Sequence, residues 1–204
     1  MMIPSASQDD FKKLQLEMGS VFLSREAWSK LELYLALLRK WSNRINLISQ
    51  RDLPSIATKH LGQALMMVPV VSSLPNRVIL DLGSGAGFPA IPLKIALPDS
   101  YFILVESRRK RANFLKEIIR SVGLDRIEVV NDRIEDWGGR QGGVDLITAR
   151  AVAAPGKMLE LVQDYLSPHG WVLTSLSEDT AADLIDLKWR IEKRNFSTTL
   201  GLFH

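Results

Sequence analysis

Apolar residues change their spacing along this chain. Between Ala27 and Trp41 they recur every three or four positions, which predicts a long amphipathic helix, and Ser24 is placed to cap its start. A second helix is predicted over residues 54–72. Beyond residue 76, short apolar runs alternate with helical segments, and this alternation predicts a parallel, doubly wound α/β sheet of the Rossmann-like kind.

This change of pattern divides the chain into an N-terminal helical extension, residues 1–75, packed on a core of residues 76–204. The extension is also expected to hold a short helix over residues 10–18, and a Pro168-His169-Gly170 turn is expected before the last strand of the core. The strands of the core are predicted at residues 78–80, 101–105, 127–130, 144–148 and 171–174, and its helices at 90–97, 107–123 and 155–165.

A glycine-rich turn follows the first predicted strand, in the stretch VILDLGSGAGFPAIP at residues 78–92. Asp81 precedes three glycines at alternate positions, Gly83, Gly85 and Gly87. Glycine allows positive φ and lets a ligand approach the main chain closely. A dinucleotide fingerprint has the spacing G-x-G-x-x-G, and an acid before it would repel a pyrophosphate at the helix N-terminus. Asp81 and the spacing G-x-G-x-G therefore favour a cofactor with a positive or amino-acid-like end.

A second acid, Glu106, ends the next predicted strand about 20 residues after the glycines, where an acidic side chain can accept the ribose hydroxyls of a nucleoside. Ligands of such sheets bind outside the carboxyl ends of the strands, which is where both acids lie. Together these features resemble the class I S-adenosylmethionine (SAM) methyltransferases, whose product is S-adenosylhomocysteine (SAH). An ordinary glycine turn in an α/β sheet is the alternative.

Composition narrows the chemistry. The 204 residues include no cysteine, which fits a reducing cytoplasm and excludes methyl transfer through a cysteine nucleophile. No apolar run approaches the roughly 20 residues of a membrane span, and the N-terminus lacks the basic and apolar regions of a secretory signal. We expect no metal, because no second histidine or acid stands at ligand spacing from His60. The chain is expected to act in the cytoplasm, away from membranes, as a monomer.

Basic residues gather in two places, although the net charge is only +3. Such clusters could neutralise RNA phosphates, and a solvated face is the alternative. Between residues 37 and 62 a single acid, Asp52, accompanies the basic side chains. The basic residues are Arg39, Lys40, Arg44, Arg51 and Lys59 in the first cluster, and the run from Arg108 to Arg111 in the second.

Several longer motifs carry a narrower resemblance. The chain is similar to the bacterial guanine-N7 methyltransferases of small-subunit ribosomal RNA, the glucose-inhibited division protein B family, from Leu31 to Leu176. That likeness implies a SAM-binding methyltransferase core with an antiparallel C-terminal edge on its sheet. It implies as substrate a guanosine in the 530 loop of 16S rRNA, presented as free RNA or as the small ribosomal subunit. The motifs are WSNRINLIS, DLGSGAGFPAIPLKI, LVESRRKRANFLK, NDRIED and ITARAVA.

The resemblance also implies roles for individual residues. Glu106 would lie near the ribose, and Asn46 and Arg51 would help to form the RNA side. The SAM contacts would fall on Gly83, Phe88, Ile134, Glu135 and Arg150, beside Asp81, Gly85 and Gly87 of the glycine turn. Further candidates for RNA contact are Arg44, His60, Arg108 and Arg109.

The expected chemistry suits these residues. Guanine N7 carries a free lone pair at neutral pH, so no general base is required, and orientation of donor and acceptor can supply much of the rate enhancement. Arg150 is the candidate catalytic residue, as a positioning group that touches the cofactor or the guanine. An ion pair of Arg150 with Asp145 or Glu135 is the alternative. Thr148-Ala149-Arg150 stands where methyltransferases of exocyclic amines resemble one another in an Asn/Asp-Pro-Pro-aromatic run, which disfavours amine methylation.

Two other functions compete with this hypothesis. A SAM- or RNA-binding module without turnover is possible, because Leu176-Ser177 stands where the family usually has a Lys-Gly pair. A nicotinamide-dependent oxidoreductase is disfavoured by Asp81 and by the spacing of the glycines. SAM binding without methyl transfer would identify the first alternative, and NAD binding the second.

Overall fold

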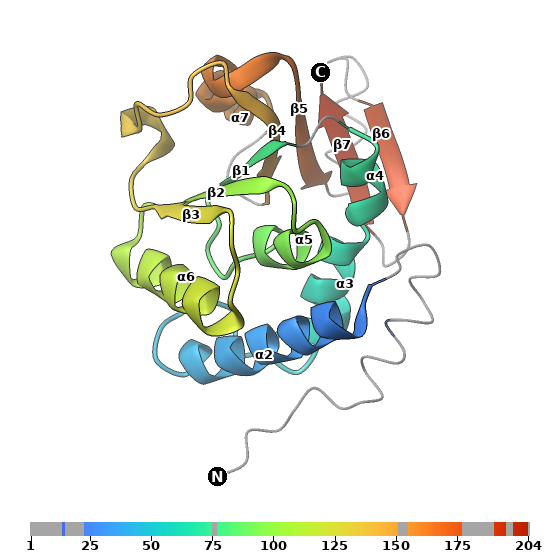
Figure 1. Cartoon of the computed structure of the whole chain (residues 1–204), viewed down its shortest axis with the longest axis vertical. Coiled ribbons are helices and arrows are strands. Elements are labelled where there is room, and N and C mark those ends of the chain that lie inside the picture. Colours follow the sequence, from blue (N-terminus) through green and yellow to red (C-terminus); the bar gives the residue numbers. More distant parts are fainter. Residues whose placement is uncertain are drawn as a thin grey trace.

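The computed structural model describes Leu14 and residues 23–74, 77–150, 155–176, 190–194 and 198–203. Within them a seven-stranded sheet has the order β3-β2-β1-β4-β5-β7-β6 (Figure 1). The strands are β1 (Val78–Leu82), β2 (Tyr101–Val105), β3 (Ile127–Val130), β4 (Val144–Ala149), β5 (Leu166–Leu176), β6 (Arg190–Arg194) and β7 (Thr198–Phe203).

Strand direction follows the predicted doubly wound scheme. β1 pairs in parallel with β2 and β4, and the parallel pairing continues to β3 on one side and β5 on the other. β7 runs antiparallel to both β5 and β6, so the expected antiparallel C-terminal edge is present. The chain reverses its direction across the sheet between β1 and β4, and in such sheets the crevice at this switch point is the usual ligand site.

Helices cover both faces of the sheet. Figure 1 shows α2, α5 and α6 on one side of the strands and α7 on the other. The helices are α2 (Arg25–Ser42), α3 (Gly62–Leu65), α4 (Val68–Ser72), α5 (Ala90–Ala96), α6 (Arg109–Val122) and α7 (Pro155–Val162). A π-helix, η1 (Ile56–Leu61), precedes α3, and two short 3₁₀ helices are η2 (Ile134–Asp136) and η3 (Gln163–Tyr165).

The central strand β2 is apolar because both of its faces are buried. Phe102 and Leu104 enter the core under α2, α5 and α6, whereas Ile103 and Val105 enter the core under α7. Successive side chains of a strand point to opposite faces, so a strand covered on both sides favours apolar residues at successive positions. This is why residues 101–105 appear in the sequence as a continuous apolar run.

The prediction for α2 is confirmed. Ser24 caps the helix, since its Oγ accepts a hydrogen bond from the Ala27 N–H at 3.1 Å. The three- and four-residue stripe is buried and packs against α5 and α6. The extension therefore shares one hydrophobic core with the sheet, and its boundary at residue 75 stays a prediction. The short helix expected over residues 10–18 lies outside the described residues except for Leu14, which is helical and buried.

The prediction of one helix over residues 54–72 is wrong. The segment forms η1, α3 and α4 in succession, with a turn at Met66 and Met67. Pro69 lies in the first turn of α4, where its missing N–H does no harm, so it starts a new helix rather than continuing the old one. π-Helical turns are rare and frequently lie at functional sites.

Two other boundaries also differ from the prediction. The Pro168-His169-Gly170 segment, expected as a turn, lies inside β5, with an irregular register opposite Val144. A Cβ on Gly170 would come within 2.9 Å of the Val144 carbonyl oxygen, so this glycine allows close approach of two strands. The helix expected over residues 155–165 ends as α7 at Val162 and continues as the 3₁₀ helix η3. Of the described helices, none combines the length and apolar character that crossing a membrane requires.

The glycine turn is also a packing point for three helices. Gly87 has φ +95°, and a Cβ there would come within 2.7 Å of Ile91 Cγ1, 3.2 Å of Tyr34 Oη and 3.3 Å of Leu115 Cδ2. Those atoms belong to α5, α2 and α6. The helical layer can approach the sheet this closely only because the turn has no side chain at this position.

A Gly87→Ala substitution should therefore destabilise the protein more than backbone strain alone explains. Gly123 at the end of α6 is a matched control, because its φ is +67° and a Cβ added there would have no described atom within 4 Å. Gly123→Ala should lower the free energy of unfolding by about 1 kcal/mol, and Gly87→Ala by clearly more. Urea denaturation measures both, and equal losses would contradict the packing role of Gly87.

Candidate active site

The glycine turn leaves β1 as a left-handed loop. Gly83, Gly85 and Gly87 all have positive φ, at 67°, 55° and 95°. The N–H groups of Gly83 and Ser84 donate to the Val105 carbonyl at 2.8 and 3.2 Å, which holds the turn against the end of β2. Residues other than glycine rarely adopt a positive φ, so the alternate glycines specify the path of the loop.

The carboxylate of Glu106 fixes this turn from below. Its Oε2 accepts the Gly85 N–H at 2.9 Å, and its Oε1 accepts the Arg108 N–H at 2.8 Å. The side chain is only 4% exposed. One carboxylate thus satisfies backbone donors of two different loops.

Asp81 lies beneath the turn and is 1% exposed. Its Oδ1 accepts the Thr148 hydroxyl at 2.7 Å, whereas Oδ2 has no hydrogen-bond partner among the described residues. Burial raises the pKa of the Asp81 carboxyl to about 6, against the opposing effects of the Thr148 hydrogen bond and the Arg150 charge. A buried carboxylate oxygen without a donor is costly for the protein alone.

Phe88, directly after the glycines, is the centre of an aromatic cluster. Tyr34 packs edge-on at 5.4 Å between ring centroids, and His60 stacks on Phe88 at 5.6 Å. The Arg150 guanidinium lies 5.4 Å from the centroid of the same ring. Tyr34 also donates its hydroxyl to the Ala86 carbonyl at 2.8 Å, which ties α2 to the turn. Neither ring nitrogen of His60 has a hydrogen-bond partner among the described residues.

The structure does not show the alternative ion pair of Arg150 with Asp145 or Glu135. Neither carboxylate forms a salt bridge with it among the described residues. Asp145 instead accepts the Val78 N–H at 2.9 Å. Arg150 directly follows β4 and lies over Phe88, close enough to Asp81 for their charges to interact.

Two cavities adjoin at the carboxyl ends of the strands, and both are lined by Gly83 and Ser107. The larger has a volume of about 570 Å³ and the smaller of about 260 Å³. The smaller one opens between β1, β2 and η2. Its other lining residues are Leu82, Val105, Asp132, Arg133, Ile134, Glu135 and Leu161. The remaining residues of the larger cavity are Leu47, Ile48, Ser49, Asp52, His60, Ser84, Gly85, Ala86, Phe88, Glu106, Arg108, Arg111 and Arg150.

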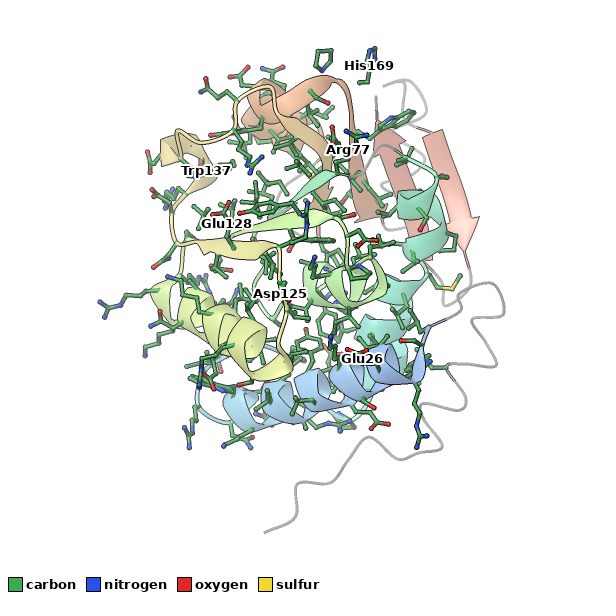
Figure 2. The ribbon with its side chains drawn as sticks, in the orientation of Figure 1. Glu26, Arg77, Asp125, Glu128, Trp137 and His169 are labelled. Carbon is green, nitrogen blue, oxygen red and sulfur yellow. The ribbon has the colours of Figure 1, made fainter. Side chains whose placement is uncertain are left out.

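Tyr165 holds the floor of the smaller cavity in place. Its hydroxyl lies 2.6 Å from the Ile134 carbonyl and 2.5 Å from the Trp137 carbonyl, and its ring stacks on Trp137 at 5.4 Å. Figure 2 shows Trp137 beyond β3, on the side of the molecule where α7 lies. The turn around η2 is therefore fastened to the helical layer, and it presents Ile134 and Glu135 to the cavity.

The structure brings most of the predicted site residues together. Those at the cavities are Gly83, Gly85, Phe88, Glu106, Ile134, Glu135, Arg150, His60 and Arg108. Asp81 and Gly87 line neither cavity. Asp81 is buried beneath the turn, and Gly87 is the third glycine of the turn itself. Arg44, Asn46, Arg51 and Arg109 are exposed outside the cavities. The Asn46 carbonyl accepts a hydrogen bond from Arg111 at 3.0 Å, which links the extension to α6.

Some residues of the site were not singled out from the sequence. Tyr34 was part of the apolar stripe of α2, and nothing in that periodicity distinguishes it from a packing residue. Thr148 and Tyr165 reach the site through contacts 67 and 31 residues apart in the chain, which periodicity does not reveal. Asp52 lines the larger cavity, and the sequence does distinguish it, because it is the single acid among the basic residues between positions 37 and 62.

Two solved methyltransferases share this arrangement of strands and helices. One from Geobacter sulfurreducens superposes with a TM-score of 0.61 at 14% identity, covering 99% of this chain and 98% of its own. The SAH-bound methyltransferase PaMTH1 of Podospora anserina gives 0.60 at 14% identity, covering 99% and 97%. The fold is therefore the Rossmann-like fold of the methyltransferases.

Sequence comparison assigns the family. A model described as GidB, rRNA small subunit methyltransferase G, matches residues 27–198. The ribosomal RNA small subunit methyltransferase G of Bradyrhizobium sp. (strain BTAi1) is 32% identical over 187 residues, which span 88% of this chain and 82% of that protein. The protein of the same name in Hydrogenovibrio crunogenus is 35% identical over 162 residues, or 78% and 73%. The chain belongs to the rRNA small subunit methyltransferase G family of enzymes, as the resemblance implied.

The raised pKa of Asp81 makes a prediction about stability. The folded carboxyl holds its proton up to a higher pH than the unfolded one, so the free energy of unfolding falls as the pH rises through this window. The Asp81→Asn variant has no carboxyl to titrate at this position, so its free energy of unfolding does not fall for this reason. The free energy of unfolding of the variant minus that of the unchanged protein should therefore rise by about 1 kcal/mol from about pH 5 to about pH 7.

Urea denaturation across this pH range measures the difference. Thr148→Val removes the donor to Asp81 and should act in the opposite direction, with a loss that is larger at neutral than at acidic pH. A constant difference between Asp81→Asn and the unchanged protein at every pH would contradict the assignment.

Proposed function

We propose that this chain transfers the methyl group of SAM to N7 of a guanosine in 16S rRNA, either as free RNA or within the small ribosomal subunit. One observation carries the proposal: a glycine turn, fixed by Glu106, separates two adjoining cavities of which one suits a nucleoside and the other a base. The names of the related proteins support rRNA as the substrate.

The smaller cavity has the features of a nucleoside site. Ile134, Leu82 and Leu161 offer apolar surface to an adenine ring, and Glu135 and the exposed backbone of the turn offer hydrogen-bond partners. Glu106 lines the adjoining larger cavity, next to Gly83 and Ser107, the two residues that both cavities share. It uses one acceptor site on each oxygen for the backbone, and a carboxylate has about four such sites, so acceptors remain for ribose hydroxyls at this junction.

Asp81 supports the methionine end of the same cofactor. Its unpartnered Oδ2 and its buried negative charge favour a cationic ligand next to the turn. A pyrophosphate would meet this charge unfavourably, which argues against a nicotinamide dinucleotide. When bound, SAM supplies a methyl group on a positively charged sulfur.

The larger cavity has room for the acceptor base. Phe88, Leu47 and Ile48 offer apolar contact, while the cationic side chains of Arg108, Arg111 and Arg150 line the same space. Exposed Arg44, Arg51 and Arg109 lie on the segments around it and extend the positive charge toward RNA phosphates. The N-terminal extension, residues 1–75, thereby supplies one wall of the active site.

The reaction needs orientation more than proton transfer. The N7 lone pair forms the bond to the methyl carbon as the carbon–sulfur bond breaks, and that electron pair stays on sulfur to give SAH. No base is required because N7 carries no proton. Arg150 positions the reacting groups beside Phe88, and the enzyme works as a cytoplasmic monomer without a metal.

The direct test is a methylation assay on small subunits from cells that lack this protein. Incubation with the protein and labelled SAM should place one label on N7 of one guanosine, located by cleavage at the modified base. SAM binding without any transfer would identify a binding module and contradict the proposal. RNA affinity should also fall steeply with added salt.

Arg150 should be sensitive to a change that keeps its charge. Arg150→Lys lacks the planar guanidinium that lies on Phe88, and misplacement of reacting groups by a small distance can lower turnover by about a hundredfold. We expect a loss of that order in the transfer rate at saturating SAM and RNA. The exposed Arg109→Lys is the control and should retain its rate, and equal rates for both variants would contradict the role of Arg150.

A further inference from the structure

The larger cavity has two walls that come from different parts of the chain. One wall is the edge of the sheet, with Gly83 to Ala86, Phe88, Glu106 and Arg150. The other wall belongs to the N-terminal extension and consists of Leu47, Ile48, Ser49, Asp52 and His60. The sheet wall continues through Gly83 and Ser107 into the smaller cavity, which suits the cofactor. The wall of the extension is therefore the one that faces the acceptor base.

Asp52 and Glu106 are the two carboxylates among the residues that line this cavity. Glu106 lies on the sheet wall, where it fixes the glycine turn and where the proposed function assigns its remaining acceptor sites to the ribose. Asp52 lies on the opposite wall. It is thus the carboxylate placed to meet a base that enters between the two walls.

Hydrogen bonds hold Asp52 in a defined position. Its Oδ2 accepts the Ser49 hydroxyl at 2.7 Å, its backbone N–H donates to Ser49 Oγ at 3.2 Å, and its Oδ1 accepts from Lys59 Nζ at 2.5 Å. The hydrogen bond from Lys59 lowers the pKa of Asp52 most, and that from Ser49 adds to it, so the pKa falls to about 2. The carboxyl is therefore ionised and only accepts hydrogen bonds. Each oxygen keeps a free acceptor site.

Guanine has an edge that matches such a group. Its N1–H and its N2 amine are neighbouring donors, and a carboxylate with two oxygens can accept from both. Adenine has an acceptor at N1 and would meet the negative charge unfavourably. These donors lie on the six-membered ring and N7 on the five-membered ring, so a base held by the outer wall turns N7 toward the sheet wall.

We propose that Asp52 is the residue that selects guanine, by accepting hydrogen bonds from N1–H and the N2 amine of the target base. The inference rests on the proposed function and adds how the site distinguishes its substrate. His60, on the π-helix η1, belongs to this wall and stacks on Phe88. Lys59, on the same helix, lies behind the wall and orients the carboxylate.

The test uses small subunits reconstituted with 16S rRNA that carries either guanosine or inosine at the methylated position. Inosine keeps N7 and N1–H but lacks the N2 amine. The unchanged protein should prefer guanosine by about tenfold to a hundredfold in kcat/KM, the effect of one hydrogen bond to a charged acceptor. In Asp52→Ala the preference should fall to about one, and kcat/KM on guanosine should fall by at least the same factor.

Lys59→Met and Ser49→Ala are the matched controls, because each removes a hydrogen bond to Asp52 and keeps the carboxylate. If Asp52 only stabilised the structure through its bonds to Ser49 and Lys59, these controls and Asp52→Ala would all show the same preference for guanosine over inosine. Under the proposal the controls still prefer guanosine, whatever their rates. Asp52→Asn, checked by thermal unfolding, is a second variant in case the alanine variant does not fold. Its amide keeps one neutral acceptor and replaces the other with a donor, so its preference for guanosine should be smaller than that of the unchanged protein.

The outcomes separate this inference from the proposed function. Equal rates of the unchanged protein on guanosine and inosine particles, or an unchanged guanosine preference in Asp52→Ala and Asp52→Asn, would overturn the role of Asp52 alone. Absence of methyl transfer to the guanosine particle by the unchanged protein would contradict the proposed function, and the inference would fall with it.

Discussion

The site depends on the two hydrogen bonds that the Glu106 carboxylate accepts from the Gly85 and Arg108 N–H groups. They join the loop after β1 to the loop after β2, at the point where the parallel strands end. Hydrogen bonds to the Val105 carbonyl and from the Tyr34 hydroxyl also hold the turn, and the Glu106 carboxylate adds the link to the loop after β2. Because the same side chain faces the cavity, the geometry of the turn and the binding of a nucleoside are coupled through one group.

The arrangement divides the tasks of the enzyme between two parts of the chain. The sheet edge, with Asp81, Glu106 and the turn, supplies charge and backbone donors suited to the proposed cofactor. The extension supplies the opposite wall, with Asp52 and His60. Tyr34 connects the two parts, since α2 packs against the sheet layer and its hydroxyl reaches the Ala86 carbonyl. The proposal that the extension selects the base and the sheet edge holds the cofactor therefore assigns the two tasks to separate parts of the chain.

Sequence reasoning predicted the parts of the fold that local patterns encode. The short apolar runs and the stripe of α2 led to the correct class of sheet and to the capped helix, and the alternate glycines marked the turn at which two cavities adjoin. It failed where distant contacts decide the structure. The π-helix η1 has no apolar period of its own, and Gly170 lies inside β5 because Val144 approaches it, although its local sequence is typical of a turn. Tyr34 and Tyr165 belong to the site through contacts 52 and 31 residues apart in the chain.

The central claim is that the acid-led glycine turn, fixed by Glu106, holds the nucleoside cofactor of a methyltransferase. A crystal structure of the protein with SAH tests it most directly. The claim predicts the adenine beside Ile134 and Glu135, the ribose at Glu106, and the amino-acid end next to Gly83 above Asp81. SAH bound away from the turn, or no SAH at saturating concentration, would contradict it.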